Sequence, residues 1–201
     1  DPYGNRLLLH ATSRTMISVH TDTVHKLPGT QLIQEDKRGI VSLSPKELRS
    51  NCLGADDGAG IYAAICMIAA SVPASFIFHR CEEIGGLGSA SLADTRPDIL
   101  EKFDRCVALD RRGTEVIITS QWTGITASNV FAVALGAALG MGHTPAAGIF
   151  TDSANYAHII PECSNISVGY YREHTPMETL DTVYLGSLIQ RLCKVNWESL
   201  P

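Results

Sequence analysis

The chain has 201 residues, a length at which one domain can bury a substantial core without disulfides or a structural metal. Its formal net charge of −5 comes from interspersed residues of both signs, and the lack of a basic stripe argues against a nucleic-acid partner. The longest apolar stretch, VFAVALGAALGMG, is shorter than the ~20 residues that a membrane span needs, so we expect no membrane partner.

Six cysteines are scattered along the chain, several of them inside apolar runs, and none forms a CxxC pair. This pattern is typical of reduced thiols, and it predicts a cytoplasmic protein without a disulfide framework. The chain opens on Asp1 and Pro2 without a methionine, which is compatible with the loss of upstream residues.

The predicted elements alternate between short strands and helices. The first half predicts a buried strand at 15–20, an exposed hairpin at 31–44, a helix at 57–70 and a strand at 75–80. The second half predicts a glycine-rich turn and helix at 85–94, strands at 105–110 and 115–120, a helix at 127–141, strands at 146–152 and 164–170, and a closing helix from Met177 to Trp197.

This alternation predicts an α/β fold, a three-layer sandwich in which helices cover both faces of a mixed, mostly parallel sheet. The sequence contains no internal repeat, low-complexity tract or linker. We therefore expect residues 1–201 to form a single domain.

Acidic and imidazole side chains follow the predicted strands, at the edge where α/β sheets bind ligands. They are His20 and Asp22 after the first strand, Glu82 and Glu83 after the strand at 75–80, Asp110 at the end of the next strand, His174 after the last strand, and Asp56 with Asp57 at a helix start. Two imidazoles with a surplus of carboxylates match a site for two divalent ions, in which one carboxylate bridges the ions.

Each motif alone has a simpler interpretation. An isolated His-x-Asp is more often a surface or capping pair, Asp56 could merely cap its helix, and Glu82 with Glu83 could be a solvated turn. These interpretations must hold for all the motifs together and in this order, which favours the metal site.

The motifs SVHTDTV, LGADDGAG, CEEIGGLGS, ALD and GYYREHTPMETLD resemble, in this order, the metal-site motifs of the co-catalytic zinc exopeptidases. That superfamily includes peptidase T, carboxypeptidase G and the bacterial leucyl aminopeptidases. The resemblance implies that His20 and Asp110 hold one metal ion, that Glu83 and His174 hold the other, and that Asp56 bridges them.

The same resemblance implies the catalytic roles. Glu82 would be the general base, which takes a proton from water and later gives it to the leaving amine. Asp22 would orient His20. The peptide bond between Asp56 and Asp57 would be cis, a form that is rare outside proline.

Substrate contacts are less clearly marked in the sequence. Tyr170 or Tyr171 could donate a hydrogen bond to the developing oxyanion, although packing against the sheet is the more common role for at least one of them. Arg172, Arg111 and Arg112 could pair with a substrate carboxylate, or they could be ordinary surface arginines.

The implied activity is that of a zinc-dependent hydrolase, an aminopeptidase or dipeptidase that cleaves an amide bond in small peptides or N-acyl amino acids. Two divalent ions per chain are expected, Zn²⁺ first, with Co²⁺ and Mn²⁺ as alternatives. Other hypotheses are an N-acyl amino acid deacylase, a non-catalytic metal-binding homologue, and a hydrolase that uses Cys81 or Ser89, although no GxSxG motif occurs.

Peptidase T and carboxypeptidase G relatives carry a separate lid domain. Here the interval from Arg111 to Asp152 is too short for such an insertion, so we expect a bare catalytic domain. Its site would be open or covered by a neighbouring subunit of a homo-oligomer.

Overall fold

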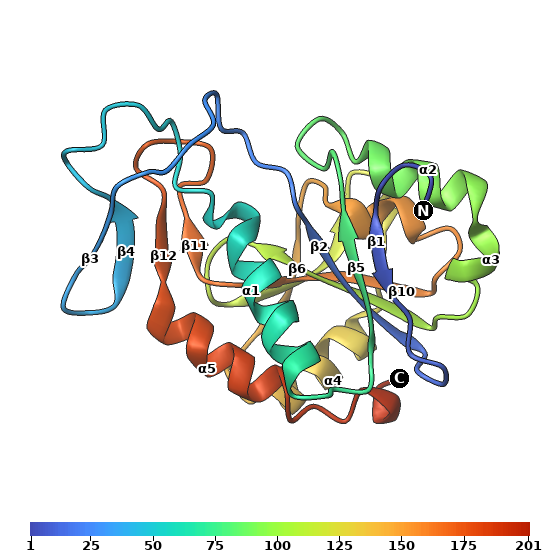
Figure 1. Ribbon diagram of the computed structural model, residues 1–201. Coiled ribbons are helices and arrows are strands. Elements are labelled where there is room, and N and C mark those ends of the chain that lie inside the picture. The colour runs from blue at the N-terminus through green and yellow to red at the C-terminus, as the bar shows by residue number, and fades with distance from the viewer.

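The computed structural model describes residues 1–201 and contains two sheets. Figure 1 shows the larger sheet crossing the middle of the molecule, with helices packed on both of its faces, and the smaller sheet at one side. The predicted α/β architecture, with a mixed and mostly parallel central sheet, is confirmed.

The larger sheet has eight strands in the order β1-β5-β2-β6-β10-β7-β8, with β9 paired to β7. They are β1 (Arg6–Leu8), β2 (Thr15–His20), β5 (Ser75–His79), β6 (Arg105–Arg111), β7 (Val116–Gln121), β8 (Gly124–Ile125), β9 (Thr144–Ala147) and β10 (Glu162–Ser167). The central strands β5, β2, β6 and β10 are parallel, whereas β1 pairs antiparallel with β5, and β7 pairs antiparallel with β10. The carboxyl ends of four strands therefore meet at one edge.

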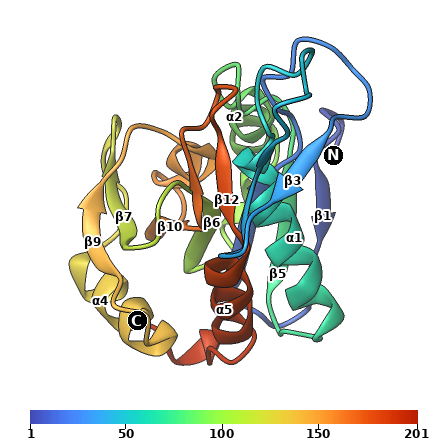
Figure 2. The ribbon, with the colours of Figure 1, turned by 90° about the vertical axis from the view of Figure 1, so that its left-hand side faces the viewer.

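Helices cover the sheet on both faces (Figure 2). One face carries α1 (Ala55–Ala69), α4 (Asn129–Leu139) and α5 (Thr182–Leu192), and the other carries α2 (Leu87–Thr95), α3 (Pro97–Leu100) and the 3-10 helix η1 (Asp152–Tyr156). A short 3-10 helix, η2 (Trp197–Ser199), follows α5. The core on the first face contains 28 buried residues, and the core on the second face contains 11. The helix α1 therefore packs against the larger core.

The smaller sheet is antiparallel, in the order β11-β12-β4-β3. Its strands are β3 (Ile33–Glu35), β4 (Ile40–Leu43), β11 (Tyr170–Tyr171) and β12 (Thr179–Asp181). The hairpin predicted at 31–44 is confirmed as β3 and β4, whose register pairs Ile33 with Leu43. The loop that carries His174 joins β11 to β12. Because β12 pairs with β4, this loop is held next to a segment that is distant in sequence.

The predicted closing helix was too long at both ends. α5 covers only Thr182–Leu192, because the Asp181 side chain caps it by accepting a hydrogen bond from the backbone N–H of Tyr184 at 2.8 Å. The residues before Asp181 form β12 instead.

The strand predicted at 146–152 was also misplaced. β9 ends at Ala147, and η1 begins at Asp152. The intervening chain leaves the sheet, so that the side chains of Thr151 and Asp152 turn inward and make hydrogen bonds to buried partners.

All six cysteines are free, and three of them are buried. No helix combines the length and the apolar character that a membrane crossing requires.

Candidate active site

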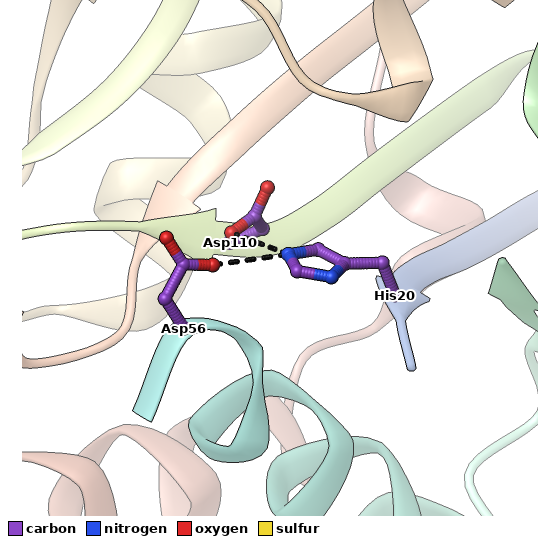
Figure 3. A group of neighbouring side chains, drawn as sticks. All are labelled: His20, Asp56 and Asp110. Atoms are coloured by element: carbon purple, nitrogen blue, oxygen red, sulfur yellow. Dashed lines mark hydrogen bonds and ion pairs between the residues drawn. The ribbon is translucent and has the colours of Figure 1, made fainter. Parts of the chain in front are cut away.

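The sheet topology brings the predicted site residues to one edge. β2 lies between β5 and β6, so His20 at the end of β2 is flanked by the loop after β5 and by Asp110 near the end of β6. Asp56 reaches the same edge from the start of α1, and His174 reaches it from the loop after β11. The close-up in Figure 3 shows His20, Asp56 and Asp110 converging from three separate elements.

The first group of side chains is buried and centred on His20. Its Nε2 lies 3.0 Å from Oδ1 of Asp56 and 3.6 Å from Oδ1 of Asp110. These three residues are each 9 % exposed or less, so their charges are shielded from water. One imidazole thus faces two carboxylates.

The second group lies beside the first and shares Asp56 with it. Nε2 of His174 lies 3.2 Å from Oδ2 of Asp56 and 2.9 Å from Oε2 of Glu83. The side chain of His174 is 46 % exposed, so this group opens to solvent. Asp56 therefore directs one carboxylate oxygen at each histidine.

The donor atoms of both groups suit divalent metal ions. Within each group, one ligand atom from every residue lies within 4.8 Å of the others. Imidazole nitrogen and carboxylate oxygen are ligands that zinc accepts, and a carboxylate between two sets of donors is the arrangement of dinuclear sites. The residues present therefore fit two ions.

Burial and the repulsion between carboxylates raise the pKa values of Asp56 and Glu83. Burial, followed by the charge of Asp110, raises the pKa of Asp56 to about 6. Burial, followed by the charge of Asp56, raises the pKa of Glu83 to about 7. Unpaired negative charge in a buried site costs free energy. Bound cations would offset this cost.

Asp22 links the end of β2 to the loop that carries the two glutamates. Its backbone carbonyl lies 3.0 Å from Nδ1 of His20, which is consistent with Nε2 of that ring facing the carboxylates. Its carboxylate accepts the backbone N–H groups of Glu82 and Glu83, both at 3.1 Å. Burial opposes ionisation of Asp22, but hydrogen bonds from His20 and the two N–H groups lower its pKa to about 2.

Asp110 is held by contacts that sequence analysis missed. The hydroxyl of Thr151 donates a hydrogen bond to Oδ2 of Asp110 at 2.6 Å. The hydroxyl of Tyr170 lies 3.1 Å from Oδ1 of Asp110 and from its backbone carbonyl oxygen. Asn165 exchanges two hydrogen bonds of 2.9 Å with the backbone of Asp110. Burial raises the pKa of Asp110, but the charge of His20 and these hydroxyl groups outweigh it and lower the pKa. Asn165 was detectable in principle, as a polar residue inside an otherwise buried strand.

Asp57 points away from the two groups and braces the start of α1. The peptide bond that joins it to Asp56 is cis, as the resemblance implied. Its carboxylate accepts the N–H of His20 at 3.1 Å and that of Gly60 at 3.0 Å. A Cβ at Gly60 would lie 2.0 Å from the carbonyl oxygen of Leu109, so only glycine lets α1 approach β6 this closely.

Glu178 is a second brace, and sequence analysis missed it. It is completely buried, and its carboxylate accepts the backbone N–H groups of Leu53, Gly54 and Asp56 at 2.8, 3.0 and 3.0 Å. The chain before α1 is thereby fixed by a residue 122 positions away from Asp56.

Glu82 lines the same pocket as the candidate metal-ligand groups. The pocket is lined by polar residues that include Glu82, Glu83 and Asp110, and by the apolar residues Ile149 and Phe150. Burial, followed by the charge of Asp110, raises the pKa of Glu82 to about 9. This carboxyl group can therefore hold a proton where a solvent-exposed glutamate would lose it.

The remaining candidates are distributed differently. Tyr170 lines the pocket and is buried, whereas Tyr171 and Arg172 lie outside it. The Tyr171 hydroxyl contacts Thr114 at 3.4 Å, and Arg172 is exposed with a left-handed φ of 57°. Ser89, considered as a nucleophile, is completely buried, and its hydroxyl contacts Asp152.

No family model and no curated protein matches the sequence. In structure, the chain is similar to aminopeptidase PepT from Bacillus cereus, with a TM-score of 0.71 and 14 % identity over 97 % of this chain and 84 % of that one. A tripeptidase from Staphylococcus aureus gives 0.73 and 12 % over 94 % and 82 %, and the TET1 peptidase of Pyrococcus horikoshii gives 0.65 and 16 % over 96 % and 87 %. The chain thus shares the fold of these peptidases.

Proposed function

We propose that the protein is a metal-dependent exopeptidase that hydrolyses an amide bond in small peptides at a site for two divalent ions. One observation carries this proposal: the carboxylate of Asp56 faces His20 with one oxygen, at 3.0 Å, and His174 with the other, at 3.2 Å. A helix cap or a surface ion pair does not need a carboxylate shared between two imidazoles. The fold shared with several aminopeptidases supports the same function.

The two groups of side chains define the proposed ligands. His20 and Asp110 would hold one ion, Glu83 and His174 would hold the other, and Asp56 would lie between them. This set of nitrogen and oxygen donors favours Zn²⁺ and also accepts Co²⁺ or Mn²⁺. When bound, two such ions would supply Lewis acidity and lower the pKa of water toward neutrality.

The residues around these ligands would transfer the proton and hold the ligands in position. Glu82 would receive the proton of the attacking water and pass it to the leaving amine, because its carboxyl group lies in the pocket beside the proposed ligands. Asp22 would fix the ring of His20 and the backbone of Glu82. Tyr170 would keep Asp110 in place through its hydroxyl.

We further propose that residues 1–201 act as a bare catalytic domain, without a lid, that associates with copies of itself. Three exposed, large apolar side chains support this: Ile149, which lines the pocket, is 74 % exposed, and Trp122 and Ile125, at the β7–β8 hairpin, are 70 and 86 % exposed. The TET1 peptidase of Pyrococcus horikoshii assembles into a tetrahedron or a large octahedral shell. Sedimentation equilibrium of the purified protein tests the proposal, and a monomer at micromolar concentration would contradict it.

The activity itself is tested with a panel of substrates. Purified protein is incubated with free dipeptides, aminoacyl anilides and N-acyl amino acids, with added Zn²⁺, Co²⁺ or Mn²⁺ and with a chelator. We expect hydrolysis of dipeptides or anilides that requires metal and stops with the chelator. Exclusive hydrolysis of N-acyl amino acids would identify a deacylase, and metal binding without turnover would identify a non-catalytic homologue.

A further inference from the structure

Arg111 brings a positive charge to the pocket that holds the proposed metal ligands. It is the last residue of β6 and directly follows Asp110. Its backbone carbonyl accepts the N–H of Val168 at 2.7 Å, so the main chain from which its side chain starts is fixed. Arg111 lines the pocket together with Asp56, Glu82 and His174, and it also lines the hollow next to that pocket.

The guanidinium of Arg111 has no partner within the protein. No carboxylate lies within ion-pair distance of it, and its Nε is buried without any hydrogen-bond acceptor. The next residue, Arg112, differs in this respect, because its Nη1 lies 2.9 Å from Oε1 of Glu173. A buried donor without an acceptor costs free energy, and at a binding site a ligand commonly removes that cost.

The charges of the pocket indicate the kind of ligand. Asp56, Glu83 and Asp110 would be occupied by the two proposed ions, and Glu173 is occupied by Arg112. Arg111 therefore remains as the cation without a counter-ion. The planar guanidinium fork matches a carboxylate with two parallel hydrogen bonds, which makes a carboxylate its preferred partner.

We propose that Arg111 binds a carboxylate of the substrate, so that the site favours short substrates in which a free carboxylate lies near the cleaved bond. The inference rests on the proposed exopeptidase function, and it narrows the substrate class. The carboxylate could be the α-carboxylate of a dipeptide or tripeptide, or the side chain of an acidic residue.

The experiment compares matched substrates that differ only in this group. One pair is Leu-Ala and Leu-Ala amide, which tests the α-carboxylate, and the other is Glu-anilide and Gln-anilide, which tests the side chain. We expect the wild-type protein, loaded with Zn²⁺, to prefer the carboxylate in one of the two pairs by about 10- to 100-fold in kcat/KM. The pair that shows the preference identifies the source.

Substitutions at Arg111 then connect the preference to this side chain. Arg111→Ala should bring the ratio within the preferred pair close to one, mainly through KM, and Arg111→Lys should retain part of it because the charge remains without the fork. Arg112→Ala is the matched control, because it removes the neighbouring arginine that already has a partner. Its ratio should stay at the wild-type value, whatever its overall rate.

A binding measurement separates this inference from the proposed function. Calorimetry with Glu82→Gln protein, with and without Arg111→Ala, gives the Kd of both members of each pair without turnover. Tighter binding of the carboxylate member that depends on Arg111 supports the inference even if the wild-type protein hydrolyses nothing, in which case only the proposed function fails. Hydrolysis of both members of each pair at equal rates, or a preference that survives Arg111→Ala, would overturn the inference and leave the exopeptidase standing.

Discussion

Two histidines that are paired in register on neighbouring strands, His20 on β2 and His79 on β5, have opposite surroundings. Nε2 of His20 faces the carboxylates of Asp56 and Asp110 at the edge of the pocket. Nε2 of His79 instead contacts the hydroxyl of Tyr156 at 2.6 Å, inside the protein. The first belongs to the candidate metal-ligand groups, and the second belongs to what we term the buried polar cluster, formed by His79, Ser89, Asp152 and Tyr156.

The acidity of the two histidines reflects this difference. Burial would lower the pKa of His20, but the charge of Asp110 and its hydrogen bond outweigh burial and raise the pKa well above its ordinary value. His79 has Asp152 as its only carboxylate, at 3.2 Å, and burial lowers its pKa to about 3. A surplus of carboxylates that faces a pocket, and not the presence of histidine and aspartate as such, therefore distinguishes the proposed metal site from the buried polar cluster.

The same isosteric change in each region should have opposite effects on metal content. Asp56→Asn removes the negative charge shared by both groups, so we expect the number of bound ions to fall below two and hydrolysis to fall to background. Asp152→Asn should retain two ions, because Asp152 faces His79 and Ser89. Elemental analysis of both variants, purified in the same way, provides the measurement. Equal metal loss in the two variants would remove the distinction drawn between the regions.

Substitution of the two neighbouring glutamates should reduce activity for different reasons. Glu82→Gln keeps its size but cannot accept a proton, so turnover should fall by about 10²- to 10⁴-fold while metal content stays normal. Glu83→Gln removes a proposed ligand, so one metal position should weaken and excess metal should partly restore activity. Metal stoichiometry and rate are measured side by side. The opposite pattern would exchange the two roles.

The pH dependence of stability should identify Asp152 as a buried acid. Burial raises its pKa to about 7, compared with about 4 when unfolded, so the folded protein retains a proton that the unfolded chain loses. Its contribution to the free energy of unfolding is present below pH ~4 and is lost as pH rises through 7, by up to about 4 kcal/mol. Asp152→Asn should remove this loss in chelator-treated protein. Urea titrations between pH 4 and 8 test it, and parallel profiles for the two proteins would refute it.

Tyr170→Phe should have the smallest effect. The hydroxyl lies 3.1 Å from Oδ1 of Asp110, so its removal should weaken the proposed first metal position and reduce the rate by about two- to tenfold. Tyr171→Phe is the matched control, because that hydroxyl contacts only Thr114, outside the pocket. Rates measured against metal concentration compare the two, and equal effects would show that Tyr170 has no special relation to Asp110.

Local sequence patterns predicted much of the architecture. The strands that end near His20 and Asp110 are short apolar runs followed by polar residues, and the structure places both where the pattern indicates. The motif order also brought the proposed ligands to one edge, because parallel strands present their carboxyl ends together.

The residues that were missed act through distant hydrogen bonds. Thr151, Asn165 and Glu178 each contact a segment 41 to 125 positions away, and no local periodicity marks such partners. The strand β12 was missed for the same reason, since its partner β4 lies in the first quarter of the chain. Pairing with the distant strand β4 thus places residues 179–181 in a strand, although their apolar spacing predicts a helix.

Anomalous diffraction from crystals of the zinc-loaded protein tests most directly whether Asp56 is shared between two metal positions. We expect two peaks per chain at the zinc edge, one on each side of the Asp56 carboxylate, the first next to His20 and Asp110 and the second next to Glu83 and His174. A single peak, or strong peaks that do not contact Asp56, would contradict it.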